Sequence, residues 1–189
     1  MHICVFGASS DLIDESYIHA VEQLGEQMAQ RGHGLVYGGS AHGLMGAIAR
    51  GVHKAGGDIL GVAPQFFDVD GKNYENCTEL VYTATMRERK RVMDERSDAV
   101  LMVPGGIGTF DEFFEILTLK QLARHNKPIA IYNVNGYFDD MMQMLETAVK
   151  QKFMPAANLE LFRCFQNPAE LLDYLEGYAE KSAGVLKHI

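Results

Sequence analysis

The stretch VLMVPGGIGTFDE, residues 100–112, decides how the rest of the chain is interpreted. Its first four residues are apolar and include two valines, a pattern typical of a parallel strand buried on both faces. Pro104 cannot donate a hydrogen bond to a sheet, so the strand should end there. Gly105, Gly106 and Gly108 follow, and glycine allows positive φ and close approach of a ligand to the backbone. The stretch therefore predicts a strand, then a glycine turn, then a helix.

The start of this helix has two interpretations. Thr109 is placed as its N-cap, and apolar residues continue at helical spacing through Phe113 and Leu117. A glycine turn before a helix presents free N–H groups and the positive end of the helix dipole, which suit a phosphate. Thr109 and Glu112 also fit a capping box, in which Glu112 only satisfies backbone donors. The turn is neither a GxGxxG fingerprint nor a Walker A loop, and both interpretations stay open on these residues alone.

Length and charge limit the function classes. With 189 residues the chain fits one domain, residues 1–189, large enough to bury a core. A formal net charge of −8 argues against a nucleic-acid-binding protein with a broad basic face. No apolar run approaches the ~20 residues that span a membrane, and the N-terminal segment MHICVFGASS reads as a first strand rather than a signal peptide. We therefore expect neither nucleic-acid nor membrane partners.

The cysteine and histidine content argues against disulfide bonds and a metal site. Cys4, Cys77 and Cys164 are far apart and odd in number, which indicates reduced thiols and a cytoplasmic location. The seven histidines form no HxH or HExxH grouping, so we expect no metal site. No cofactor is predicted.

Strand and helix patterns alternate along the chain. Strands are expected at 2–6, 35–37, 59–62, 79–84, 100–103 and 129–132, and helices at 14–31, 43–55, 86–93, 109–125, 138–150 and 169–180. This alternation predicts an α/β fold, a Rossmann-like, doubly wound parallel sheet in a single domain. Glycine-rich turns follow the first, second and fifth strands and should meet at the carboxyl edge, where such sheets bind ligands. The mixed loop 64–78 has the length of a lid or binding loop.

The basic segment 86–93 contains four cations within five positions, from Arg87 to Arg91. A solvated helix face is the common explanation for such a run. The segment also directly precedes the strand that leads into the glycine turn at 104–108, so its cations can reach the same sheet edge. Arginine suits bidentate contact with phosphate or carboxylate.

These segments together resemble the Lonely Guy family. The resemblance extends from Phe6 to about Met154, and the PGGxGTxxE turn with a nearby Arg-Lys pair is specific at family level. The segments that carry it are 37–40, 43–46, 86–90, 104–112, 121–128 and 133–138. Such proteins were formerly described as lysine decarboxylases, but this chain has no pyridoxal-phosphate lysine motif to support that activity.

The resemblance implies a Rossmann-like fold, a homodimer and a nucleoside 5′-monophosphate substrate. The implied reaction is hydrolysis of the N-glycosidic bond of cytokinin riboside 5′-monophosphates, and also of adenosine monophosphate, to free base and ribose 5-phosphate. Arg89 and Glu112 match the family's catalytic pair. The positions that match its nucleotide-binding residues are Lys90, Gly105, Gly106, Ile107, Gly108, Thr109, Phe110, Asp111 and Thr118.

The chain departs from the family pattern near the expected site. Arg87 stands where the family usually has His, Asp111 where it has Glu, and Leu119 where it has Trp. These changes leave the base preference open. Two alternatives to the hydrolase are a non-catalytic carrier of a nucleotide or molybdenum cofactor, and a broader nucleosidase acting on ordinary nucleoside monophosphates. The coexistence of Arg89, Glu112 and the complete turn favours an enzyme, because a carrier would not need the pair.

Overall fold

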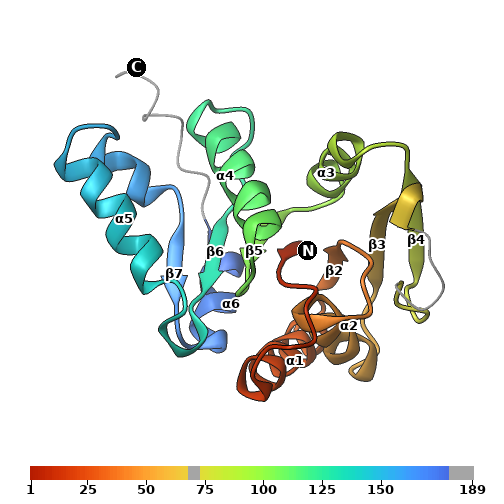
Figure 1. Ribbon diagram of the computed structural model, residues 1–189. Coiled ribbons are helices and arrows are strands. Elements are labelled where there is room, and N and C mark those ends of the chain that lie inside the picture. The colour runs from red at the N-terminus through yellow and green to blue at the C-terminus, as the bar shows by residue number, and fades with distance from the viewer. Residues whose placement is uncertain (68–72, 179–189) are drawn as a thin grey trace.

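A computed structural model describes residues 1–67 and 73–178. Within them the chain forms a seven-stranded sheet in the order β4-β3-β2-β1-β5-β6-β7, with every neighbouring pair parallel (Figure 1). The strands are β1 (His2–Phe6), β2 (Gly34–Tyr37), β3 (Ile59–Pro64), β4 (Glu79–Thr83), β5 (Ala99–Met102), β6 (Ile129–Tyr132) and β7 (Arg163–Phe165). The predicted α/β, Rossmann-like fold is confirmed.

Helices cover both faces of this sheet. They are α1 (Glu15–Gln30), α2 (Gly43–Lys54), α3 (Met86–Glu95), α4 (Ile107–Gln121), α5 (Asp139–Lys150) and α6 (Pro168–Glu176). Helices α1, α2 and α6 bury their apolar faces in one core layer, and α3, α4 and α5 bury theirs in the other (Figure 1). The central strands β1, β2, β5 and β6 are apolar along nearly their whole length because both of their faces are covered. Among the described residues, no helix is long and apolar enough to cross a membrane.

Two helices end at a glycine, as the sequence predicts, and two others end at residues that are not glycine. Gly32 after α1 and Gly56 after α2 have positive φ, and the N–H groups that follow them bond back into the last helical turn. Helices α4 and α5 end in the same way, but Ala123 and Lys152 take the left-handed conformation, with φ of 51° and 65°. Neither residue is glycine, so the sequence gives no sign of the helix end there. The prediction that α4 continues to residue 125 was therefore wrong, because the helix ends at Gln121.

Other boundaries also differ from the prediction. Strand β7 was not expected, because three residues with a charge at one end carry no strand pattern. The loop at 64–78 begins with a short 3-10 turn, Gln65–Phe67, and its residues 68–72 lie outside the described part of the chain. Helix α6 ends at Glu176. The last two positions of the predicted helix, 179 and 180, lie outside the described part of the chain.

The three glycine turns meet at the carboxyl edge, as the sequence predicts. Ala8, after β1, donates its backbone N–H to the carbonyl of Pro104 after β5, with an N–O distance of 3.0 Å. The Ala8 carbonyl accepts a hydrogen bond of 3.1 Å from Met45 in the first turn of α2. The turn after β1 is thus held between the turn after β5 and the start of α2, the helix that follows the turn after β2.

Candidate active site

Arg89 is a buried arginine on α3, with 5% of its surface exposed. Its Nε donates to the carbonyl oxygen of Val62 on β3 at 3.0 Å, and its Nη1 donates to Oε1 of Glu112 at 2.6 Å. Gly38, at the end of β2, leaves room for the guanidinium, because a Cβ there would lie 2.1 Å from Nη2 of Arg89. Three elements therefore fix the direction of this side chain.

Glu112 lies in the second turn of α4, and only 10% of its side chain is exposed. Burial raises the pKa of its carboxyl above the ordinary value, and the charge of Arg89 opposes that rise. This pairing replaces the predicted capping box. Helix α4 begins at Ile107 with Gly106 as its N-cap, so Thr109 lies inside the first turn and caps nothing.

A variant of this box occurs at α3, where the glutamate reaches the N–H of the residue before the N-cap Thr85. The Thr85 hydroxyl accepts a 3.1 Å bond from the Glu88 backbone N–H, and the Glu88 carboxylate accepts a 2.8 Å bond from the N–H of Ala84. The local pattern is the same at the two helix starts. The difference comes from a tertiary partner, Arg89, which is available only to Glu112.

Lys90, next to Arg89 on α3, contacts two acidic residues of α4. Its Nζ lies 3.1 Å from Oδ2 of Asp111 and also donates a short hydrogen bond to Oε2 of Glu115. The two adjacent residues of the basic segment thus bind two successive turns of the same helix. The interpretation of the whole segment as a solvated face was wrong for Arg89 and Lys90.

The glycine turn before α4 is packed on one side and open on the other. Gly105 is buried, and a Cβ there would lie 2.1 Å from Oγ1 of Thr109 and 3.0 Å from the backbone nitrogen of Ala8. Gly106 and Gly108 are exposed, with nothing within 4 Å of a Cβ at either position. The N-terminal end of α4 therefore presents backbone N–H groups to an open space.

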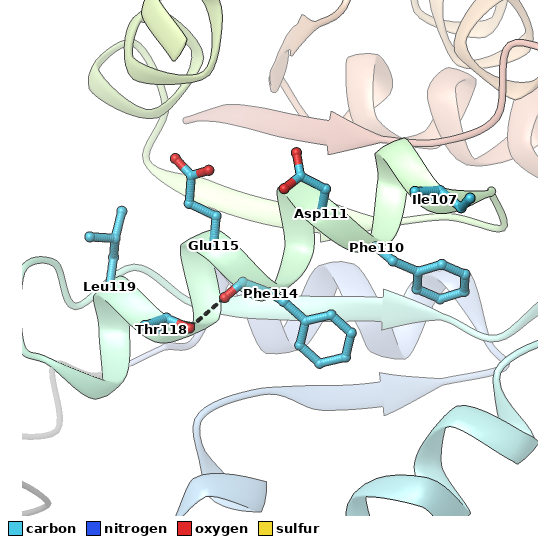
Figure 2. A pocket seen from close by; sticks show the side chains of 7 residues that line it. All are labelled: Ile107, Phe110, Asp111, Phe114, Glu115, Thr118 and Leu119. Carbon is cyan, nitrogen blue, oxygen red and sulfur yellow. Dashed lines mark hydrogen bonds between the residues drawn. The ribbon is translucent and has the colours of Figure 1, made fainter. Parts of the chain in front are cut away.

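Two hollows lie along adjoining faces of α4 and share Glu115 and Leu119 as lining residues. An open groove of about 550 Å³ is lined by Ile107, Phe110, Asp111, Phe114, Glu115, Thr118 and Leu119. In Figure 2 the rings of Phe110 and Phe114 point to one side of the helix, and the carboxylates of Asp111 and Glu115 point to the other. A smaller cavity of about 240 Å³ lies between α3 and α4 and is lined by Phe6, Arg87, Lys90, Arg91, Asp94, Glu112, Glu115, Ile116 and Leu119.

Comparison with known proteins places the chain in a family. A family model described as "Possible lysine decarboxylase" matches residues 45–175. The chain is 36% identical over 95% of its length, and 84% of the relative's, to cytokinin riboside 5′-monophosphate phosphoribohydrolase LOG2 of Arabidopsis thaliana. It is 38% identical over 93% of its length, and 72% of the relative's, to the probable phosphoribohydrolase LOGL5 of Oryza sativa subsp. japonica. The chain belongs to the Lonely Guy family.

Solved structures outside the phosphoribohydrolases share this Lonely Guy fold. A molybdenum cofactor binding protein from Rippkaea orientalis aligns with a TM-score of 0.71 at 20% identity, over 93% of this chain and 94% of that one. The molybdenum cofactor carrier protein of Chlamydomonas reinhardtii aligns with a TM-score of 0.69 at 20% identity, over 93% and 95%. At this identity the likeness is one of fold alone.

The Lonely Guy positions expected at the site are brought together only in part, because the side chains of Ile107, Phe110 and Thr118 line the open groove and not the cavity that contains Glu112. Arg89 contacts Glu112, Lys90 contacts Asp111, and the turn from Gly105 to Gly108 begins the same helix. Thr118 lies apart from them. Its hydroxyl donates to the Phe114 carbonyl at 2.7 Å, and it lines the open groove rather than the cavity that contains Glu112 (Figure 2).

Two residues of the site were not foreseen. Glu115 shares Lys90 with Asp111, and its spacing of four residues from Asp111 on one helix was the available signal. The Tyr137 hydroxyl donates to the Gly105 carbonyl at 2.7 Å and braces the glycine turn, a tertiary contact without a local signal. No group of three or more metal-ligating side chains occurs in the described ranges.

Proposed function

We propose that this protein hydrolyses the N-glycosidic bond of nucleoside 5′-monophosphates, releasing free base and ribose 5-phosphate. Cytokinin riboside 5′-monophosphates and adenosine monophosphate are the proposed substrates. The observation that carries the proposal is the ion pair of Arg89 and Glu112, buried and joined at 2.6 Å, one helical turn after an open glycine turn. The family relatives named as phosphoribohydrolases support the same reaction class.

The glycine turn is the proposed phosphate subsite. The 5′-phosphate would accept hydrogen bonds from backbone N–H groups of residues 106–109, where the dipole of α4 also favours negative charge. A phosphate bound there places the ribose beside the following turn of the helix, which contains Glu112. The turn thus serves to position the sugar.

The proposed chemistry uses the charge of Glu112. Cleavage of an N-glycosidic bond develops positive charge on the ribose, as in an oxocarbenium ion. The carboxylate of Glu112 stabilises that charge and accepts a proton from the attacking water, whose oxygen bonds to the anomeric carbon as the N-glycosidic bond breaks. The base leaves with the electron pair of that bond, and the proton taken by Glu112 passes to it, which gives the free base and restores the carboxylate. Arg89 holds the carboxylate in one orientation through its bonds to Val62 and Glu112.

The test is ribose 5-phosphate release from adenosine monophosphate and isopentenyladenosine monophosphate by wild-type protein and by Glu112→Gln. The amide keeps the size of the side chain but cannot carry the charge, so we expect turnover to fall by about 10²–10⁴-fold while nucleotide binding persists. Glu95→Gln is the matched control, because Glu95 is exposed on α3 and its ion-pair partner among the described residues is Arg91.

Two results would contradict the proposal. Near-wild-type turnover by Glu112→Gln would remove the catalytic role of the carboxylate. Tight nucleotide binding with no release by wild-type protein would favour a carrier, the function named for the structures of similar fold.

We also propose that the protein is a homodimer joined through the outer face of α4. Ile107 is 89% exposed there, and Phe110 and Phe114 line the open groove next to it. Phe113 and Leu117, on the same helix, point into the core and are not available to a partner. An apolar surface of this kind is typical of an interface.

A further inference from the structure

Three successive carbonyl oxygens of the glycine turn are held by three different parts of the protein. The Pro104 carbonyl accepts the Ala8 N–H of the turn after β1 at 3.0 Å, and the Gly106 carbonyl accepts a backbone N–H from within α4 at 3.1 Å. The carbonyl between them, that of Gly105, accepts the Tyr137 hydroxyl of the segment after β6 at 2.7 Å. Of these three bonds, only the third depends on a side chain.

The hydrogen bond from Tyr137 sets the orientation of a whole peptide group. The Gly105 carbonyl and the Gly106 N–H belong to one planar trans peptide, in which the two groups point in opposite directions. Neither glycine has a Cβ to restrict rotation of this peptide plane. The hydroxyl therefore determines where the Gly106 N–H points, and that N–H is one of the donors proposed for the 5′-phosphate.

The ring of Tyr137 is fixed by its own packing. It meets the ring of Tyr17 on α1 edge to face, with the centroids 6.1 Å apart, and the ring of Phe138 in the same way at 4.9 Å. The preceding turn is tied to α1 as well, since the Asn135 side chain donates to the Ser16 hydroxyl at 2.9 Å. The hydroxyl is thus carried by a ring whose direction is set by α1 and by the segment after β6.

We infer that Tyr137 is a positioning residue of the phosphate subsite, because it holds the peptide between Gly105 and Gly106 with its N–H directed at the 5′-phosphate. The inference rests on the proposed function, since it takes the glycine turn as the place where the phosphate binds. A donor that is already oriented binds an anion without the cost of first rotating the peptide. Tyr137 thereby increases the preference for a nucleotide over the corresponding nucleoside.

The test compares the dissociation constants of two analogues, carbocyclic adenosine monophosphate and carbocyclic adenosine, which differ only in the 5′-phosphate. A methylene replaces the ring oxygen in both, so the base cannot leave through an oxocarbenium ion and binding is measured without turnover. Calorimetry on wild-type protein and on Tyr137→Phe gives the two constants. Phenylalanine keeps the ring that packs on Tyr17 and Phe138 and removes only the hydroxyl, so the variant should fold.

We expect Tyr137→Phe to raise the dissociation constant of the phosphorylated analogue by about 3–10-fold, the effect of one hydrogen bond, and to leave that of the nucleoside analogue unchanged. Tyr178→Phe is the matched control. It also removes a tyrosine hydroxyl that donates one hydrogen bond, to Oδ1 of Asn126 at 3.3 Å. Asn126 precedes β6 and so lies at the opposite edge of the sheet from the glycine turn, and this variant should keep both wild-type constants.

The outcomes separate this inference from the proposed function, which ribose 5-phosphate release tests independently. Unchanged binding of the phosphorylated analogue in Tyr137→Phe, or an equal loss for both analogues, overturns the positioning role even if the wild-type protein is a hydrolase. A wild-type protein that binds neither analogue overturns it as well. If no ribose 5-phosphate is released but Tyr137→Phe weakens the phosphorylated analogue alone, the hydrolase fails and the role of Tyr137 stands.

Discussion

Gly38 has no Cβ, and the Arg89 guanidinium occupies the space that a Cβ would take. A substitution at this glycine therefore tests the position of Arg89. We predict that Gly38→Ala displaces Arg89 from Glu112, since the added methyl would lie 2.1 Å from Nη2. The proposed hydrolysis should fall by about tenfold or more, because misplacing a catalytic group by about 1 Å costs up to about 10²-fold. Ribose 5-phosphate release measures this effect.

A control for this change is Gly177→Ala after α6, where a new Cβ would lie 3.1 Å from the Asp173 carbonyl oxygen and meet no other atom of the described residues within 4 Å. That variant should retain wild-type turnover. Full activity in Gly38→Ala would mean that Arg89 can reach Glu112 from another position, contrary to the packing described.

The residue scale also shows where sequence reasoning stops. The identities of Arg89 and Glu112 could be predicted, because both lie in motifs that the family resemblance covers. Their contact could not be derived locally, since Thr109 and Glu112 fit a capping box as well as Thr85 and Glu88 do. Only the sheet order, which brings α3 beside α4, decides which glutamate caps and which one pairs.

Helix ends offer a test at the scale of elements. We predict that Ala123→Gly and Lys152→Gly each raise the free energy of unfolding by about 1 kcal/mol, because both residues hold positive φ that glycine adopts without strain. Urea denaturation measures the change. Ala148→Gly, inside α5, is the opposing control and should lower stability by about 0.5–1 kcal/mol. A loss of stability at both C-terminal positions would contradict the strain argument.

The segment after α4 should make stability depend on pH. His125 is half-buried, its Nε2 lies 2.8 Å from the Ile116 carbonyl, and its Nδ1 accepts from the Lys127 N–H at 3.2 Å. Burial lowers its pKa below the ordinary 6.5, so the unfolded chain binds the proton more tightly than the folded one. The stabilisation is therefore complete above pH 6.5 and is lost as the pH falls through 6.5 toward the folded value.

Thermal unfolding between about pH 8 and about pH 5 tests this dependence. We expect His125→Gln to lose part of the acid destabilisation that the wild-type protein shows. His19→Gln, at an exposed position on α1, should keep the wild-type profile. Identical pH profiles for His125→Gln and wild-type protein would show that this imidazole binds a proton equally well in the folded and the unfolded state, contrary to the prediction.

At the scale of the whole molecule, most of the sheet could be predicted and one edge could not. The central strands are apolar runs followed by glycine turns, so their periodicity and their common edge are visible in the sequence. Strand β7 has three residues and, within the described part of the chain, pairs with β6 and no other strand. Its place depends on the segment between β6 and β7, which includes α5, returning the chain to the edge of the sheet. No sequence pattern within 163–165 indicates this strand, so its position could not be predicted.

The proposed dimer gives a prediction at this scale. Phe114→Asp places a charge in the open groove on α4 and should convert dimer to monomer, because an unpaired carboxylate is costly in an apolar interface. Light scattering with size-exclusion chromatography measures the mass. Phe153→Asp is the matched control, since Phe153 is 87% exposed after α5 and lies outside the groove. A monomeric wild-type protein, or a dimeric Phe114→Asp, would contradict the proposal.

The place of β1 in the sheet has a consequence for biosynthesis. Of the seven strands described, β1 is made before the other six, and it is central in the sheet, between β2 and β5. Strands β1 to β4 can pair while the nascent chain is still growing, but the other edge of β1 stays open until residues 99–102 emerge. Arg89 is made before that event and Glu112 after it. Both members of the proposed catalytic pair are therefore present only after β5 has emerged to pair with β1, and a chain that stalls between residues 89 and 99 exposes an unpaired edge of β1 and lacks Glu112.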